Sequence, residues 1–180
     1  MKSVRVAVCV FVVVAFVASN IALAQGPPMP KAGPEQQRLK YFVGTWKSEG
    51  EMKASDFGPA GKFTSTDESR MLGDFFIVTN SKGNGSMGPM DEVATLGYDP
   101  KLKAYIYSSY NSLGMHDQAT GHVSGKVWTW TNEEDMGGKK VKGKFTITEV
   151  SATSYTYSFD TSTDGKTWTN VMQGKATKTK

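Results

Sequence analysis

The feature that most constrains this fold is a two-residue alternation of side-chain types, which starts at Thr45 and recurs to the end of the chain. In the first run, Trp46, Ser48, Gly50 and Met52 alternate with a polar set of Thr, Lys and Glu. A period of two places the two sets on opposite faces of a β-strand. The pattern therefore predicts strands with one solvent-facing side and one buried side.

The same alternation predicts ten strands in all. After the run that starts at Thr45, the predicted strands cover residues 62–72, 75–81, 92–98, 103–111, 115–123, 126–131, 141–150, 154–162 and 168–177. Turn residues separate the runs, and Asp164-Gly165 is a strong two-residue hairpin signal. Because parallel strands need long crossovers, these short links predict an antiparallel sheet.

A single domain of ten antiparallel strands has two sheet edges to protect. An up-and-down barrel removes both edges by joining the first strand to the last, whereas a sandwich leaves them exposed. The sequence therefore favours an all-β closed barrel over a sandwich. A short helix is expected ahead of it over residues 35–42, since Leu39, Phe42 and Val43 share one helical face. The Lys, Glu and Thr on the outer faces indicate a barrel in water, because a membrane barrel carries apolar residues there.

The first 24 residues have the features of a secretory signal peptide. Lys2 and Arg5 form a basic start, residues 6–18 form an apolar stretch, and Ala22-Leu23-Ala24 matches a small-x-small cleavage site. The apolar stretch is shorter than the about 20 residues that a membrane-spanning helix needs. We therefore expect cleavage before Gln25, no membrane span in the mature chain, and a secreted or periplasmic location.

This leader sets the expected domain organisation. A Pro-rich tether is predicted over residues 25–34, followed by a single barrel domain over residues 35–180. Cys9 is the only cysteine and lies inside the leader, so the mature chain is expected to have no thiol and no disulfide. The formal net charge of +4 falls to +2 without Lys2 and Arg5, which is too weak a bias to indicate a nucleic-acid partner.

The inward faces of the predicted strands combine aromatic and polar side chains. The polar residues with inward parity are Ser48, Ser65, Asp67, Ser69 and Asn170. In a packed core each unsatisfied group would cost about 1–3 kcal/mol, so a wet or ligand-filled interior is favoured. We expect a small, partly hydrophobic ligand in this interior. The residues predicted to contact it are Trp46, Asp67, Trp128, Tyr157 and Trp168.

Motifs of established chemistries are weak in this chain. Residues 83–88 match the G-x-G-x-x-G spacing, but no helix is expected after them, so residues 82–91 are interpreted as a flexible loop that could cover the barrel mouth. His116 and His122 lie roughly 20 Å apart on one predicted strand, so a single metal cannot bind both, and both are expected at the surface. Glu133-Glu134-Asp135 is interpreted as a solvated turn. We predict no catalytic residue, metal site or cofactor.

Three kinds of function remain open. The first is a barrel that binds a small hydrophobic or amphipathic molecule. The second is a packed interaction module that works through its surface. The third is an enzyme on the same scaffold that uses Asp67, Glu68 or Arg70. The sequence identifies no particular ligand, and a homo-oligomer is compatible with it.

Several short motifs resemble those of a known family. They are Gly33-Pro34-Glu35, Val43-Gly44-Thr45-Trp46, Gly97-Tyr98-Asp99-Pro100 and Asp164-Gly165-Lys166-Thr167-Trp168. In this order they resemble a family of bacterial secreted proteins of uncharacterised function that have a lipocalin-like, or calycin, barrel. The resemblance implies a closed antiparallel barrel with an internal cavity, and it implies no particular activity.

The Gly44-Thr45-Trp46 start is also distantly similar to that of nitrobindin, a haem-binding barrel. In nitrobindin the haem ligand is a histidine late in the chain. This sequence has no histidine after His122, so a haem site is not carried over.

Overall fold

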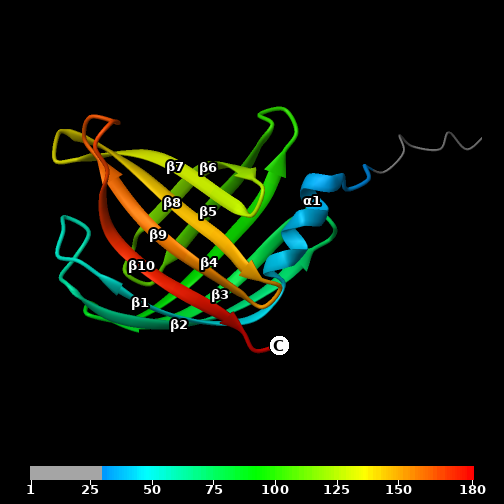
Figure 1. Cartoon of the computed structure of the whole chain (residues 1–180), viewed down its shortest axis with the longest axis horizontal. Helices are drawn as coiled ribbons and strands as arrows, with labels where there is room; N and C mark the ends of the chain where they lie inside the picture. Colours follow the sequence, from blue (N-terminus) through cyan, green and yellow to red (C-terminus); the bar gives the residue numbers. More distant parts are fainter. Residues whose placement is uncertain (1–29) are drawn as a thin grey trace, which may run out of the picture. The chain divides into compact units, whose positions relative to one another are not determined.

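The computed structural model describes residues 30–180, and in this part of the chain ten strands follow a short helical segment (Figure 1). The helix α1 covers Pro34–Arg38 and continues as a 3₁₀ helix, η1, over Leu39–Phe42. The strands are β1 (Gly44–Met52), β2 (Gly61–Leu72), β3 (Phe76–Gly85), β4 (Gly88–Asp99), β5 (Ala104–Asn111), β6 (His116–Ser124), β7 (Val127–Met136), β8 (Lys139–Ser151), β9 (Ser154–Ser162) and β10 (Thr169–Lys178). The predicted signal peptide and residues 25–29 of the predicted tether lie outside the described residues.

The strands form a closed antiparallel barrel, as predicted. Each strand pairs with its neighbours in the sequence, and β1 pairs with β10 from Trp46 opposite Lys178 to Met52 opposite Met172. This last pairing leaves no free sheet edge, which is the property that favoured a barrel over a sandwich. Within residues 30–180, no helix is long and apolar enough to span a membrane.

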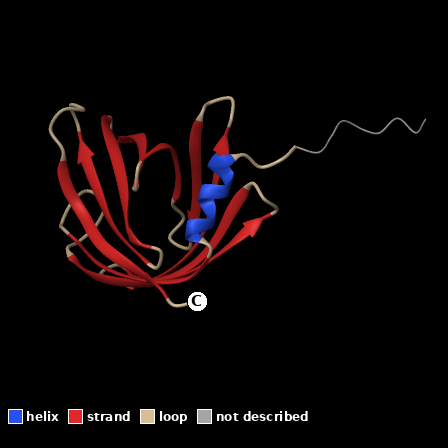
Figure 2. Cartoon of the chain, turned by 45° about the vertical axis from the view of Figure 1, so that its right-hand side comes forward, coloured by secondary structure: helices blue, strands red, loops and turns tan. Residues whose placement is uncertain are grey.

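The helical segment lies against one end of the barrel (Figure 2). The Tyr105 hydroxyl donates to the Glu35 carbonyl oxygen at 3.2 Å, and Arg38 donates to the carbonyl oxygen of Gly125 in the β6–β7 turn. The Trp46 indole N–H donates to the Phe42 carbonyl oxygen at 2.9 Å. The segment is thereby attached to β1, to β5 and to a turn between strands, all at this end.

The barrel interior is packed beneath this segment. Leu39 is fully buried, and the Phe42 ring lies edge-on to Trp128 with 5.0 Å between ring centroids. Trp128 also contacts Tyr105, at 4.9 Å, and stacks on Trp130, at 5.7 Å. Large aromatic rings in these arrangements dominate core burial. The barrel therefore has a packed core next to this segment.

Two glycines allow inward rings to lie flat on the barrel wall. Gly50 of β1 pairs with Gly174 of β10, and their other neighbours across the sheet are Phe63 and Tyr157. A Cβ atom at Gly50 would lie 2.6 Å from Cζ of Phe63, and one at Gly174 would lie 2.5 Å from Cζ of Tyr157. The rings therefore occupy the space that side chains would fill at these glycines.

A β-bulge in β10 changes which residues face inward near the start of that strand. The register with β9 shifts between Asn170 and Met172. A shift of one residue reverses the facing of every side chain before it. Asn170 therefore pairs with Asp160 and donates to its carboxylate at 3.2 Å, instead of facing the interior as predicted.

The prediction that Trp168 faces the barrel interior is wrong, and the same bulge explains why. This residue precedes β10, and its ring packs under the Lys144 ammonium, 4.2 Å from the ring centroid. Lys144 alternates with the inward-facing Phe145, so it lies on the outer side of the barrel. Trp168 is an outer-surface residue and does not line the interior.

Candidate functional site

The barrel contains a partly open cavity of about 430 Å³, called here the interior cavity, which reaches Phe42 of the helical segment. Side chains from all ten strands line it. Its apolar wall consists of Phe42, Trp46, Phe57, Ile77, Ala94, Leu96, Ala119, Trp130, Phe145, Ile147, Tyr155, Phe159 and Met172. Its polar wall consists of Asp67, Ser69, Thr79, Ser81, Glu92, Thr95, Tyr107, Asp117, Asn132 and Glu134. The cavity is therefore amphipathic, with aromatic rings on one part of its wall and carboxylates on another.

Asp67 is held by serine side chains of its own and the neighbouring strand. The Ser65 hydroxyl donates to its Oδ1 at 3.1 Å, and the buried Ser48 hydroxyl donates to its Oδ2 at 3.3 Å. A further inward pair, Ser69 and Thr79, shares a hydrogen bond of 2.8 Å. These inward polar groups, which the sequence analysis linked to a ligand or to water, are thus satisfied by one another.

Glu92 is a carboxyl group of the cavity wall whose pKa is raised. Burial raises its pKa, and the nearby Asp117 and Asp67 carboxylates raise it further. The Tyr107 hydroxyl donates to Glu92 Oε1 at 3.3 Å, which opposes this rise. The pKa of Tyr107 is itself raised, first by burial and then by Glu92.

Glu134 completes the acidic wall. Burial raises its pKa, and the adjacent Asp117 raises it further. The Asn132 amide donates to Glu134 Oε1 at 2.9 Å and partly offsets these effects. Glu92, Asp117 and Glu134 are called here the acidic wall, in which the Asp117 carboxylate disfavours ionisation of both glutamates.

The strands that carry Asp117 and Glu134 are not paired along their full length. Pairing between β6 and β7 runs from Thr120 opposite Thr131 to Ser124 opposite Val127. Beyond it, β6 extends to His116 and β7 to Met136 with no pairing between them among the described residues. The acidic wall thus borders the one stretch of the described barrel in which two adjacent strands both continue without pairing to each other. This stretch is called here the β6–β7 seam.

The β1–β2 loop, rather than residues 82–91, contributes a ring to the cavity. Phe57 of this loop lines the cavity and lies edge-on to Phe159 at 5.4 Å. Residues 82–91 were predicted as a flexible loop, but β3 runs to Gly85 and β4 starts at Gly88. The polar and glycine-rich composition of this segment is typical of a loop, but the segment forms a tight hairpin in which β3 and β4 pair up to the turn.

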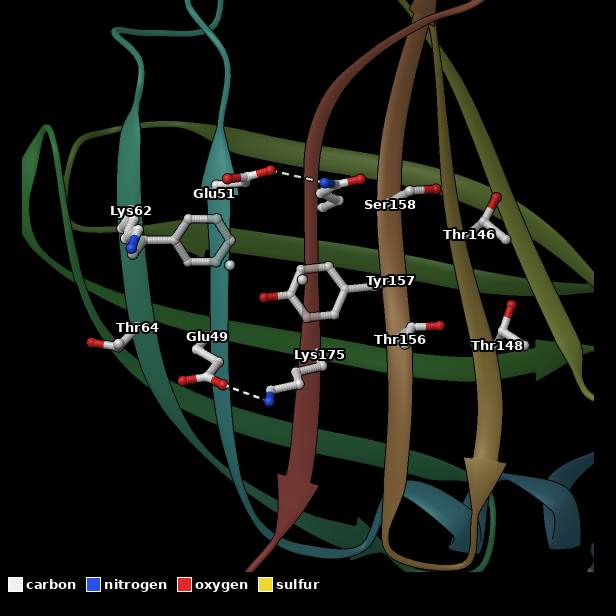
Figure 3. Close-up of a pocket in the computed structure, with 14 residues that line it drawn as sticks. Glu49, Glu51, Lys62, Thr64, Thr146, Thr148, Thr156, Tyr157, Ser158 and Lys175 are labelled. Atoms are coloured by element: carbon white, nitrogen blue, oxygen red, sulfur yellow. Dashed lines mark hydrogen bonds and ion pairs between the residues drawn. The ribbon is translucent and has the colours of Figure 1, made fainter.

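A second hollow, of about 780 Å³, is open to solvent and lies over outward-facing side chains of β1, β2, β8, β9 and β10 (Figure 3). Across it Lys175 forms an ion pair with Glu49 at 2.8 Å, and Gln173 donates to Glu51 at 2.8 Å. These polar groups are already paired and exposed. The hollow therefore offers less to a ligand than the interior cavity does.

The residues predicted to bind a ligand are placed in three different environments. Trp46 and Asp67 line the interior cavity. Trp128 lies in the packed end, where its indole N–H donates to Glu149 Oε1 at 2.6 Å. Tyr157 lies in the barrel wall over Gly174, and Trp168 lies on the outer surface as described above.

The acidic wall is not evident from the sequence motifs. Glu92 has the same parity as Ala94 and Leu96, and Glu134 has the same parity as Trp128 and Trp130. This parity was the available signal, since it places both glutamates inside. Glu134 was missed because the strand was ended at Thr131, whereas β7 continues to Met136.

The other predicted chemical groups lie at the surface. His116 and His122 are exposed, as predicted, and His116 stacks on Tyr110 at 4.6 Å. Glu68 and Arg70 are exposed on the outer face of β2. In residues 30–180, no three His, Cys, Asp or Glu side chains come together in a way that could hold a metal ion.

Comparison with known proteins yields a family and a fold. A family model described as "Protein of unknown function (DUF1579)" matches residues 31–178, and no curated protein matches the chain. The crystal structure of Rv2717c from M. tuberculosis is similar with a TM-score of 0.56 at 14% identity, covering 83% of this chain and 100% of that one. The S-type phycobiliprotein lyase CPES from Guillardia theta is similar with a TM-score of 0.58 at 8% identity, covering 81% of this chain and 92% of that one. At these identities the likeness shows a shared barrel fold alone.

Proposed function

Because this chain belongs to the DUF1579 family of unknown function, its role has to be inferred from its own cavity, and we propose that it carries a small amphipathic molecule inside the barrel. The single observation that supports this proposal most strongly is the interior cavity itself. Its volume of about 430 Å³ falls within the range of about 300–1,000 Å³ that is typical of small-molecule sites. Rings such as Phe145 and Phe159 would remove the apolar part of a ligand from water, while the polar wall would orient its polar end.

The cavity also separates this proposal from a packed interaction module. Such a module would have a filled interior throughout, but the packing around Trp128 stops short of the acidic wall. Half-buried carboxylates such as Glu92 are costly for a protein whose interior only has to be filled. A ligand-binding role explains why carboxylates line the cavity, whereas a purely structural role does not.

The raised pKa of Glu92 favours one alternative, an enzyme. A half-buried carboxyl group with a raised pKa, next to Tyr107 and Asp117, has the character of a general acid or base. If the protein is an enzyme, a bound molecule will leave chemically changed. Mass spectrometry of a bound compound, before and after incubation with the protein, distinguishes catalysis from carriage, because a carrier returns the compound unaltered.

We further propose that the mature protein acts outside the cytoplasm, as its N-terminal sequence indicates. Fractionation of cells that produce the full chain tests this. The expected result is a mature protein that begins at Gln25, identified by N-terminal mass spectrometry in the extracytoplasmic fraction. Recovery of an uncleaved chain from the cytoplasm of its native host would contradict it.

The binding proposal is tested with the apolar dye N-phenyl-1-naphthylamine, whose emission rises in apolar surroundings. We expect saturable binding of one dye per protein, which Ala119→Phe abolishes because Ala119 lines the cavity and the new ring would fill it. The matched control is Ala152→Phe, at an exposed position in the β8–β9 turn, which should bind the dye normally. Equal binding by both variants would show that the dye binds elsewhere and would refute the proposal.

A further inference from the structure

We propose that the interior cavity selects an organic cation, an amphipathic molecule whose ammonium or amidinium group lies against Glu92, Asp117 and Glu134. This inference rests on the proposed function, since it assigns the charge of the molecule that the cavity holds.

The charged side chains of the cavity wall are all acidic. Asp67, Glu92, Asp117 and Glu134 line the cavity, whereas no lysine, arginine or histidine of the described residues does. None of these four carboxylates forms an ion pair within residues 30–180. The chain as a whole has a formal net charge of +4, so the acidic interior does not simply follow the composition. A cationic ligand would supply the missing counter-charge where the surroundings screen charges less than water does.

The distribution of the carboxylates over several strands indicates the size of the cation. The carboxylates of the acidic wall come from three strands, β4, β6 and β7. No set of three acidic side chains in the described chain could hold a metal ion, so a small spherical ion lacks enough ligands here. An ammonium or amidinium group has several N–H donors that point in different directions, and it can donate to carboxylates that are spread around it. The acidic wall therefore fits an organic cation better than a metal ion.

Aromatic side chains line the same cavity as these carboxylates. Rings of Trp46, Tyr155, Phe145 and Phe159 line the cavity. Aromatic faces attract cations electrostatically and also bury apolar groups. Aromatic rings together with carboxylates are the combination that recognises an ammonium group on an apolar body. A neutral apolar ligand would use the rings but would leave the carboxylates desolvated and unpaired.

The electrostatics of the acidic wall support the same conclusion. Burial and neighbouring carboxylates raise the pKa of Glu92 and of Glu134. A cation between them would favour the ionised forms and lower both pKa values. Binding of the cation should therefore weaken as the pH falls and Glu92 and Glu134 become protonated.

The test uses three dansyl probes with the same fluorophore and the same kind of alkyl tail. Dansylcadaverine ends in an ammonium group, its N-acetyl derivative ends in a neutral amide, and dansyl-6-aminohexanoate ends in a carboxylate. Dissociation constants are measured by fluorescence titration of the full chain at low ionic strength. We expect the cation to bind at least about tenfold more tightly than the neutral probe, and the anion to bind most weakly, because hydrogen bonds to charged groups are the strong ones.

Variants of the protein locate the effect. Glu92→Gln and Asp117→Asn should each weaken binding of the cation by about tenfold and leave the neutral probe within about twofold. Glu68→Gln is the matched control, because Glu68 is exposed on the outer face of β2 and its loss removes the same charge from the protein. It should change neither affinity by more than about twofold, since exposed charges are well screened.

The outcomes separate this inference from the proposed function. If the neutral or anionic probe binds as tightly as the cation, or if Glu68→Gln acts like Glu92→Gln, the preference for a cation is refuted while binding in the cavity stands. If none of the three probes binds, the proposed function fails and this inference fails with it. The comparison of probes on the unmodified protein decides the point even if a variant does not fold.

Discussion

Leu39 provides a quantitative test of whether the helical segment belongs to the cooperative unit of the barrel. The Leu39 side chain is fully buried in the packed end, next to Phe42 and Trp128 in the same cluster. Leu39→Ala removes three carbon groups at about 0.8 kcal/mol each, and the cavity left behind brings the total loss to about 3–5 kcal/mol. A domain of about 150 residues loses roughly 2–4 °C of melting temperature per kcal/mol, so the expected fall is roughly 6–20 °C.

The assay is thermal unfolding followed by circular dichroism, with Lys40→Ala as the control. Lys40 lies on the same turn but is exposed, so its removal should change the melting temperature by less than about 2 °C. If both variants melt together with the unmodified protein, the segment is only loosely attached to the barrel. The reasoning that makes it part of the barrel core would then be wrong.

Three further predictions concern the carboxylate and the aromatic contacts of the barrel. Because burial raises the pKa of Glu92, the folded protein binds that proton more tightly than the unfolded chain, and stability is lost as the pH rises through the raised pKa. Glu92→Gln should therefore melt at a higher temperature than the unmodified protein at neutral pH and at the same temperature in acidic buffer; a lower melting temperature at neutral pH would contradict this. Gly174→Ala should cost about 1–3 kcal/mol in urea unfolding, since its Cβ would overlap the Tyr157 hydroxyl, and an unchanged midpoint would show that the ring moves freely. Trp128→Phe should cost about 1.5–3 kcal/mol in the same assay because Glu149 loses its 2.6 Å donor, and a smaller loss would mean that water replaces the indole.

The fold was predictable because it depends on local alternation. Runs such as Trp46 to Met52 specify a strand and its buried face without reference to the rest of the chain. The antiparallel order then followed from short links, and barrel closure followed from the need to protect two edges. The pairing of β1 with β10 confirms this inference.

The candidate site was only partly predictable. Whether a side chain points into or out of the barrel depends on β-bulges and strand ends, which the alternation of residue types does not reveal. One bulge residue before Met172 is enough to move Trp168 from the expected interior to the outer surface. Glu134 is charged and lies close to Gly137-Gly138, so its local sequence resembles a turn, and only the pairing of β7 with β8 keeps it in a strand. Whether Trp46 and Asp67 contact a ligand stays a prediction, although both line the cavity.

The β6–β7 seam gives this barrel an unusual mechanical freedom. Elsewhere, a wider barrel would require breaking backbone hydrogen bonds between adjacent strands. Beyond Thr120 and Thr131 there are none to break, so β6 and β7 can move apart there at little cost. We therefore expect β6 and β7 to separate more readily beside Asp117 and Glu134 than the fully paired strands do. Amide hydrogens along this stretch should exchange with solvent faster than those of any other strand pair, and a bound guest should slow them.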